Sequence, residues 1–234
     1  MNIYLYQNWL QSYREIQTEE DTLWYYGDIY KPKYNANRGD VETQKKANKF
    51  LKTCTNSEEW AKFAYENGLQ FQACKMDGTH VEANLEQDII NDIVISFLDD
   101  DNDIFMYYVF RLQENGKYFL IGMKFWEWTE NKKTDEDYTK EWLYTFEPNG
   151  KVEVIERKKD AKEECVWTSK QPLNVESNWQ EKPEFDNWDG FFEMKRWKDG
   201  ELHEPFKGSP IKEYIYKGGS RFYKDKDGNL IEDN

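Results

Sequence analysis

The fold is decided by residues 104–128, which read IFMYYVFRLQENGKYFLIGMKFWEW. Two β-rich runs, Ile104–Leu112 and Lys117–Trp128, flank Glu114-Asn115-Gly116, and an Asn-Gly pair between such runs is a strong hairpin signal. Glycine takes the positive φ of a tight turn at no steric cost. The stretch therefore predicts two antiparallel strands joined by a short turn.

The same pattern recurs at Asn149-Gly150, between Trp142–Phe146 and Lys151–Ile155. Further turns are predicted at Asp77-Gly78, Asp189-Gly190, Asp199-Gly200 and Asp227-Gly228. The glycines of these turns do not recur at a fixed period, so no propeller or solenoid is indicated. The stretch 158–189 contains two prolines and little periodicity, and we interpret it as a long loop or linker.

Helical spacing of apolar residues characterises the first hundred residues. It predicts helices over Tyr6–Ile16, Val41–Cys54, Asn56–Gly68 and Leu85–Leu98, whereas Thr18–Asp40 is expected to be a loop. Asn56 is expected to cap the third helix, which ends at Gly68. The fold class expected is α+β, with N-terminal helices followed by an antiparallel meander of β-hairpins. Residues 1–234 are expected to form one unit, with any boundary near 158–189.

Composition points to a folded domain with a charged exterior. Aromatic residues make up 17% of the chain and charged residues 33%, and disorder normally couples high charge with few aromatics. The net charge is −14, of which residues 1–130 carry −9 (13 basic, 22 acidic) and residues 131–234 carry −5 (19 basic, 24 acidic). Such a field repels nucleic acid and anionic membranes, and it attracts basic partners.

Three cysteines at irregular spacing indicate a reducing compartment rather than a disulfide framework. The first ten residues have neither a basic region nor a continuous apolar run, so no signal peptide is expected. No stretch approaches the ~20 apolar residues of a membrane span. The expected location is cytoplasmic, without membrane association.

Catalytic and cofactor motifs are hard to find in this sequence. His80 and His203 each follow a predicted turn, and only spatial contact could make Cys74 and His80 a nucleophilic pair. Zinc-ligand spacings and phosphate-binding loops do not occur. The Asp225–Gly228 stretch lacks both end ligands of a calcium loop. No cofactor or metal is therefore expected, and Trp126, Trp128 and Trp142 are interpreted as core in preference to sugar-stacking platforms.

The acidic run from Met76 to Phe110 contains nine Asp and Glu residues and no Lys or Arg. On the expected helix over 85–98, carboxylates lie opposite the apolar stripe, and others follow at the helix C-terminus, where they oppose the helix dipole. Carboxylates that lie close together repel one another and add nothing to folding stability, but they favour association with a cationic partner. The partner-binding residues predicted are Glu86, Asp88, Asp92, Asp99, Asp100, Asp101 and Asp103. A solvated helix end is the alternative explanation.

These observations favour a non-catalytic intracellular protein that neutralises a basic protein by covering it. The most specific form is an immunity or antitoxin partner of a bacterial toxin, such as a nuclease with a positive cleft. Neither nucleic acid nor membrane is expected to bind. Two alternatives stay open: an enzyme of unrecognised type, such as a carboxylate-based hydrolase, and a carbohydrate-binding module with exposed tryptophans.

Overall fold

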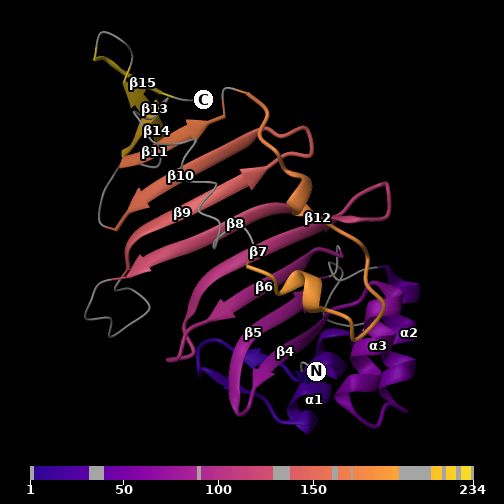
Figure 1. Ribbon diagram of the computed structural model, residues 1–234. Coiled ribbons are helices and arrows are strands. Elements are labelled where there is room, and N and C mark those ends of the chain that lie inside the picture. The colour runs from indigo at the N-terminus through magenta and orange to yellow at the C-terminus, as the bar shows by residue number, and fades with distance from the viewer. Residues whose placement is uncertain are drawn as a thin grey trace. The chain divides into compact units, whose positions relative to one another are not determined.

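The computed structural model describes residues 3–31, 40–88, 91–128, 138–159, 163–169, 171–194, 212–217, 220–224 and 228–232 (Figure 1). The chain forms two compact units. Unit 1 comprises Met1–Ile104, Val109–Tyr118 and Glu181–Phe192, and unit 2 comprises Phe105–Tyr108, Phe119–Gln180 and Glu193–Asn234. Because compactness does not measure cooperative unfolding, the prediction that 1–234 folds as one unit, with any boundary near 158–189, stays a prediction.

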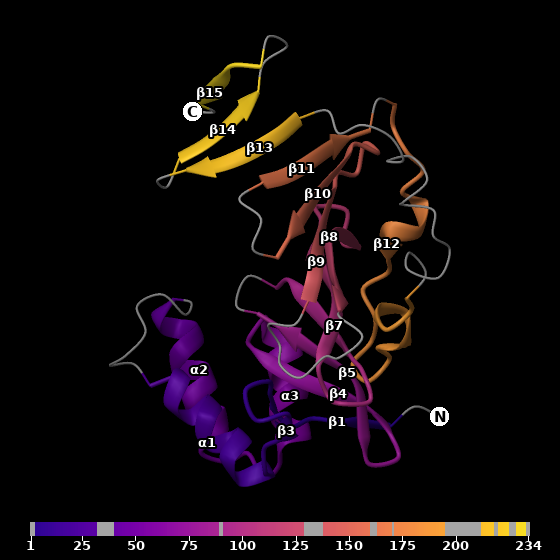
Figure 2. The ribbon, with the colours of Figure 1, turned by 90° about the vertical axis from the view of Figure 1, so that its left-hand side faces the viewer.

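Among its described residues, unit 1 combines three α-helices with antiparallel strands. The helices are α1 (Glu19–Ile29), α2 (Val41–Leu51) and α3 (Ser57–Asn67). The strands are β1 (Ile3–Leu5), β2 (Trp9–Leu10), β3 (Glu15–Ile16), β4 (Phe71–Asp77), β5 (His80–Gln87) and β6 (Ile93–Leu98). The strand order is β1-β4-β5-β6, and β2 pairs with β3 separately. Figure 2 shows α1 beside α2.

Strands β7 (Ile104–Leu112) and β8 (Tyr118–Trp128) contribute residues to both units. The other described strands of unit 2 are β9 (Tyr138–Phe146), β10 (Val152–Lys158), β11 (Glu163–Thr168), β12 (Trp179–Gln180), β13 (Lys212–Lys217), β14 (Ser220–Lys224) and β15 (Leu230–Glu232). Their order is β8-β9-β10-β11-β13-β14-β15, with β12 beside β8. Helices and largely antiparallel strands confirm an α+β fold. No described helix is long and apolar enough to cross a membrane.

The predicted hairpins are confirmed at 77–80, 113–117 and 147–151. Gly116 and Gly150 have φ of +80° and +86°, and each follows an Asn whose Oδ1 accepts from the next Lys amide. Gly228 also has a positive φ, whereas Asp227 and the predicted turn at Asp199-Gly200 lie outside the described residues. The predicted turn at 189–190 is part of a single 3-10 turn, Asp189–Phe191.

The prediction of a helix over Tyr6–Ile16 is wrong, because strands precede the first described helix. Tyr6–Ile16 forms β2 and β3, and Tyr13 lies 73% exposed in the turn between them. The loop predicted over 18–40 contains α1 instead. Thr18 caps that helix, since its Oγ1 accepts from the amide of Asp21 at 3.1 Å. Acidic residues fill the first turn of α1, where they favour the helix dipole.

The helix predicted over Leu85–Leu98 is also wrong. This stretch forms the end of β5, a turn at Asp88–Asp92 and strand β6, with Leu85 opposite Ile95. Strand alternation buries Leu85, Ile93, Ile95 and Phe97 on the sheet. Three of these positions are spaced by four or eight residues, which explains why they also fit a helical stripe.

The predicted second and third helices are confirmed as α2 and α3. Asn56 caps α3, accepting from the amide of Glu59 at 2.8 Å, and Gly68 ends it in the left-handed conformation. The indole of Trp60 is fully buried, and rings from all three helices surround it: Tyr26, Tyr30, Phe50 and Phe63. This aromatic cluster joins the helices of unit 1.

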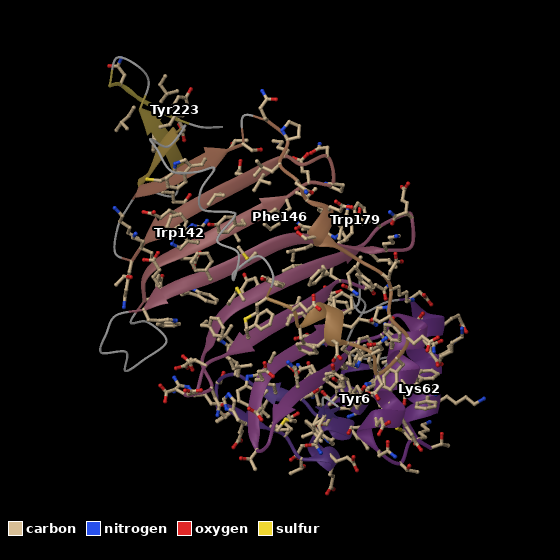
Figure 3. All side chains as sticks on the ribbon, viewed as in Figure 1. Tyr6, Lys62, Trp142, Phe146, Trp179 and Tyr223 are labelled. Atoms are coloured by element: carbon tan, nitrogen blue, oxygen red, sulfur yellow. The ribbon has the colours of Figure 1, made fainter. Side chains whose placement is uncertain are left out.

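The stretch 158–189, interpreted as loop or linker, instead contains β11 and ends in a core residue of unit 1. Trp188 is 0% exposed and packs against Tyr65, Phe71 and Phe185. Its Nε1 donates to Tyr6 Oη at 3.0 Å, and Tyr6 (labelled in Figure 3) donates to Asp186 Oδ1 at 2.6 Å. The segment 181–192 therefore contributes the buried rings of Trp188, Phe191 and Phe192 to unit 1.

Replacing Gly150 by Ala is expected to lower the free energy of unfolding by about 2–4 kcal/mol, from left-handed strain plus overpacking. A Cβ at Gly150 would lie 2.5 Å from the carbonyl oxygen of Leu173, a backbone atom that cannot rotate away. Gly116 is the matched control, because it has a similar φ but no described atom within 4 Å. Urea unfolding should show a loss of only about 1 kcal/mol for Gly116→Ala. Equal losses would contradict the prediction.

Candidate functional site

Four of the seven predicted partner-binding residues lie in the turn between β6 and β7. Asp99 stabilises this turn, because its Oδ1 accepts from the amides of Asp101 (3.0 Å) and Asp103 (2.9 Å). Asn102 takes the left-handed conformation, with φ of +62°. The Asp103 side chain is 7% exposed and pairs with Arg14 Nη2 at 2.7 Å. Asp100 and Asp101 are exposed.

The other predicted residues lie at or near the turn between β5 and β6, which has the same design. Asp88 Oδ1 accepts from the amide of Asp92 at 2.9 Å, and Asn91 has φ of +61°. The Asp92 side chain is 6% exposed and accepts from Arg111 Nη2 at 2.7 Å and from its Nε at 3.0 Å. Glu86, on β5, accepts from Gln70 Nε2 at 2.9 Å.

The structure does not bring the seven carboxylates together. The two turns lie at opposite ends of β6, whose six residues span about 20 Å. Two of the seven, Asp92 and Asp103, are neutralised by arginines from outside the run 76–110. Successive hairpins alternate ends, so Asp77 of the β4–β5 turn lies on the same side as Asp100 and Asp101. We call Asp77, Asp100 and Asp101 the acidic turn surface.

A second acidic surface of unit 1, on α1, was missed by sequence reasoning. Helical phase separates the run Trp24-Tyr25-Tyr26: Tyr26 is buried, whereas Trp24 is 67% exposed. Glu20, Asp21 and Asp28 lie three or four positions from Trp24, hence on the same helix face. Recognising Thr18 as a cap with acidic residues behind it is the signal that would have found this helix.

The structure does not assemble a nucleophilic pair from Cys74 and His80. Cys74 lies opposite Asn84 and His80 opposite Asp77, three residues apart along β4. Burial raises the pKa of the Cys74 thiol to about 12, which disfavours the reactive thiolate. No group of three His, Cys, Asp or Glu side chains among the described residues could hold a metal ion. His203 and Asp225–Asp227 lie outside those residues.

Unit 2 carries a mixed ion-pair network across β8, β9, β10 and β11. Glu141 pairs with Lys124 at 2.6 Å and with Arg157 at 3.1 Å, and Arg157 also pairs with Glu164. Lys124 Nζ lies 4.7 Å from the ring centre of Trp126, a cation–π contact. Burial, together with Glu141, raises the pKa of Tyr107. The two positive and two negative side chains of this network neutralise one another, as expected of ion pairs that stabilise neighbouring strands.

The tryptophans of unit 2 do not form a row of solvent-facing indoles. Trp126, Trp128 and Trp142 are all half-buried. Trp142, labelled in Figure 3, stacks on Trp167 and donates from Nε1 to Glu127 Oε1 at 2.8 Å. Across the described part of the chain, Trp24 is the one exposed tryptophan. The geometry expected of a carbohydrate-binding platform is therefore not seen among these residues.

The described residues thus offer two acidic surfaces on unit 1 and a charge-balanced network on unit 2. The acidic turn surface retains part of the predicted partner-binding set, and the α1 face adds an exposed aromatic ring. No model of a known protein family matches the sequence, and no curated protein matches it significantly.

Proposed function

We propose that this chain is a non-catalytic protein that binds and covers a cationic protein, with an immunity- or antitoxin-type inhibitor as its specific form. The observation that carries the proposal is the charge of unit 1. Its residue ranges hold 24 acidic and 13 basic side chains, a net charge of −11. Unit 2 holds the remaining 22 acidic and 19 basic side chains, a net charge of −3. Unit 1 therefore carries most of the net negative charge of the chain.

The acidic turn surface supplies exposed carboxylates for such a partner. Asp99 holds the turn through its backbone contacts, so Asp100 and Asp101 can face solvent from the turn between β6 and β7. Adjacent like charges repel each other and add nothing to stability. They do raise the association rate with a positively charged surface and discriminate against acidic competitors. A toxin whose active cleft binds an anionic substrate presents that kind of surface.

Reversing Asp100 and Asp101 to Lys is expected to slow association with the cationic partner about tenfold or more, because steering depends on local charge. The matched control reverses Glu153 and Glu176, two exposed carboxylates of unit 2, and should change the rate much less. Both double variants should keep the wild-type melting temperature, since exposed charges contribute little to stability. Surface plasmon resonance with the partner identified after capture measures the rates.

The partner is identified by capture from a lysate at about 0.05 M and about 0.5 M salt, followed by mass spectrometry. Screening shortens the reach of the charges from above 10 Å to a few Å over this range, so capture should weaken strongly. Capture of acidic proteins only, or capture that is indifferent to salt, would overturn the proposed function.

A further inference from the structure

The α1 face of unit 1 carries an exposed aromatic ring, the indole of Trp24. Trp24 is 67% exposed, although tryptophan side chains are highly buried on average. Thr22, Tyr26 and Ile29 bury the opposite face of the helix. Tryptophan is also one of the residue types enriched at binding hot spots, which cluster near the centres of protein interfaces. The ring of Trp24 is therefore accessible to a partner.

Gly27 gives a second, independent observation on the same face. It lies inside α1, where glycine is less favourable than alanine. The backbone does not require it, because Gly27 is absent from the residues with positive φ, and a Cβ added there meets no described atom within 4 Å. A glycine without a structural reason permits close approach of a ligand to the backbone. It leaves a bare strip of helix three residues from Trp24.

The charges around Gly27 and Trp24 determine which chemical groups of a partner would bind there. Glu20 and Asp21 are exposed in the first turn of α1, and Asp28, beside Gly27, pairs with Lys31 at 2.9 Å. Glu20 and Asp21 interact favourably with the helix dipole, which explains why acidic residues occur in the first turn. The dipole does not explain the exposed indole of Trp24, one turn further along the helix. A guanidinium or ammonium group over the indole gains a cation–π contact and lies within reach of these carboxylates.

We propose that Trp24 and Gly27 form the centre of a docking surface for an Arg- or Lys-bearing segment of a cationic protein. The segment's backbone approaches α1 at Gly27, its cationic side chain covers the indole of Trp24, and Glu20 and Asp21 flank that side chain. This inference rests on the proposed function and adds a second contact surface of unit 1 to the acidic turn surface. Charge complementarity with a unit of net charge −11 commits the surface to this occupant.

The first test compares Trp24→Ala and Gly27→Ala with Tyr13→Ala, a control that removes a similarly exposed ring elsewhere on unit 1. Trp24→Ala should weaken the captured partner's affinity about tenfold or more, and Tyr13→Ala less than twofold. Gly27→Ala should weaken binding while its melting temperature rises by roughly 2–4 °C. Lost binding with raised stability cannot result from unfolding. Wild-type affinity in both Trp24→Ala and Gly27→Ala would overturn the inference.

The second test uses a defined probe and needs no captured partner. An octa-arginine peptide is titrated into nitrogen-15 labelled protein, with Trp24→Phe assigning the indole signal and octa-glutamate as the control peptide. The Trp24 signal should shift most, and about 0.5 M salt should reduce the shift. Shifts confined to other indoles, or none, would overturn the docking surface. If capture finds no basic partner but the Trp24 signal shifts, the proposed function fails and the surface stands.

Discussion

Replacing Trp188 by alanine is expected to lower the free energy of unfolding of unit 1 by about 3–5 kcal/mol, the usual cost of deleting a buried aromatic ring. The indole is fully buried against Tyr65, Phe71 and Phe185. The substitution also removes the Nε1–H that Tyr6 Oη accepts, so the hydroxyl of Tyr6 loses a donor in a buried position. Urea unfolding followed by circular dichroism measures the change in midpoint.

Two controls separate this core effect from a general loss of aromatic surface. Trp24→Ala removes the same side chain from an exposed position and should stay within about 0.5 kcal/mol of wild type. Tyr6→Phe keeps the ring but removes the hydroxyl between Trp188 and Asp186, and should cost about 1–3 kcal/mol. A cost below about 1 kcal/mol for Trp188→Ala would show that segment 181–192 is not docked in unit 1.

The role of Trp188 was outside the reach of sequence reasoning. Residues around it include Pro183 and Gly190, and this composition predicts a loop. The segment is indeed mostly irregular, yet Trp188 meets Tyr6 and Phe71, more than a hundred residues earlier in the chain. Periodicity reports local secondary structure, whereas a single anchoring ring on an irregular segment has no period. Only tertiary packing shows it to be core.

Local turn chemistry, in contrast, was predictable where glycine marks the turn. Asn115-Gly116 and Asn149-Gly150 correctly predicted two hairpins. The turns at 88–92 and 99–103 follow the same design with Asn91 and Asn102 in the left-handed position, and both read Asp-x-x-Asn-Asp. That repeated pattern was the available signal against a helix over 85–98. It was obscured because apolar strand residues also fell at helical spacing.

Prediction of the candidate site was limited in the same way, because sequence patterns do not report tertiary contacts. The run from Met76 to Phe110 contains no Lys or Arg, but ion pairs form between residues that are distant in sequence. Arg14 and Arg111 lie outside that run and neutralise Asp103 and Asp92. Neither pairing has a sequence signature, because each joins separate strands or turns.

Alkaline pH is expected to unfold the protein, because burial raises the pKa of many of its acidic hydroxyl and thiol groups. Desolvation raises the pKa of Tyr65 and Cys74 to about 12 each. It is also the main cause of the raised pKa values of Tyr6, Tyr26, Tyr107, Tyr118 and Tyr144. In the unfolded chain these side chains return to ordinary values, 10.0 for tyrosine and 9.0 for cysteine.

The sign follows from proton linkage. Above pH 9 to 10 the unfolded chain loses protons that the folded protein keeps, so unfolding releases protons and becomes more favourable as pH rises. The stability from these groups is therefore complete below pH 9 and is lost progressively as pH rises toward 12. Tyrosinate absorbance and far-ultraviolet circular dichroism, followed together against pH, should show the buried tyrosines ionising as the dichroism signal disappears.

A single substitution sharpens this expectation. Tyr118 is 1% exposed and packs edge-on against Phe191. Tyr118→Phe keeps that ring contact and removes one hydroxyl of raised pKa, so the alkaline midpoint should move to higher pH. Tyr13→Phe, at an exposed position, should leave the midpoint unchanged. Complete tyrosinate formation near pH 10 with an undiminished dichroism signal would contradict burial as the cause, because water would then reach these hydroxyls in the folded protein.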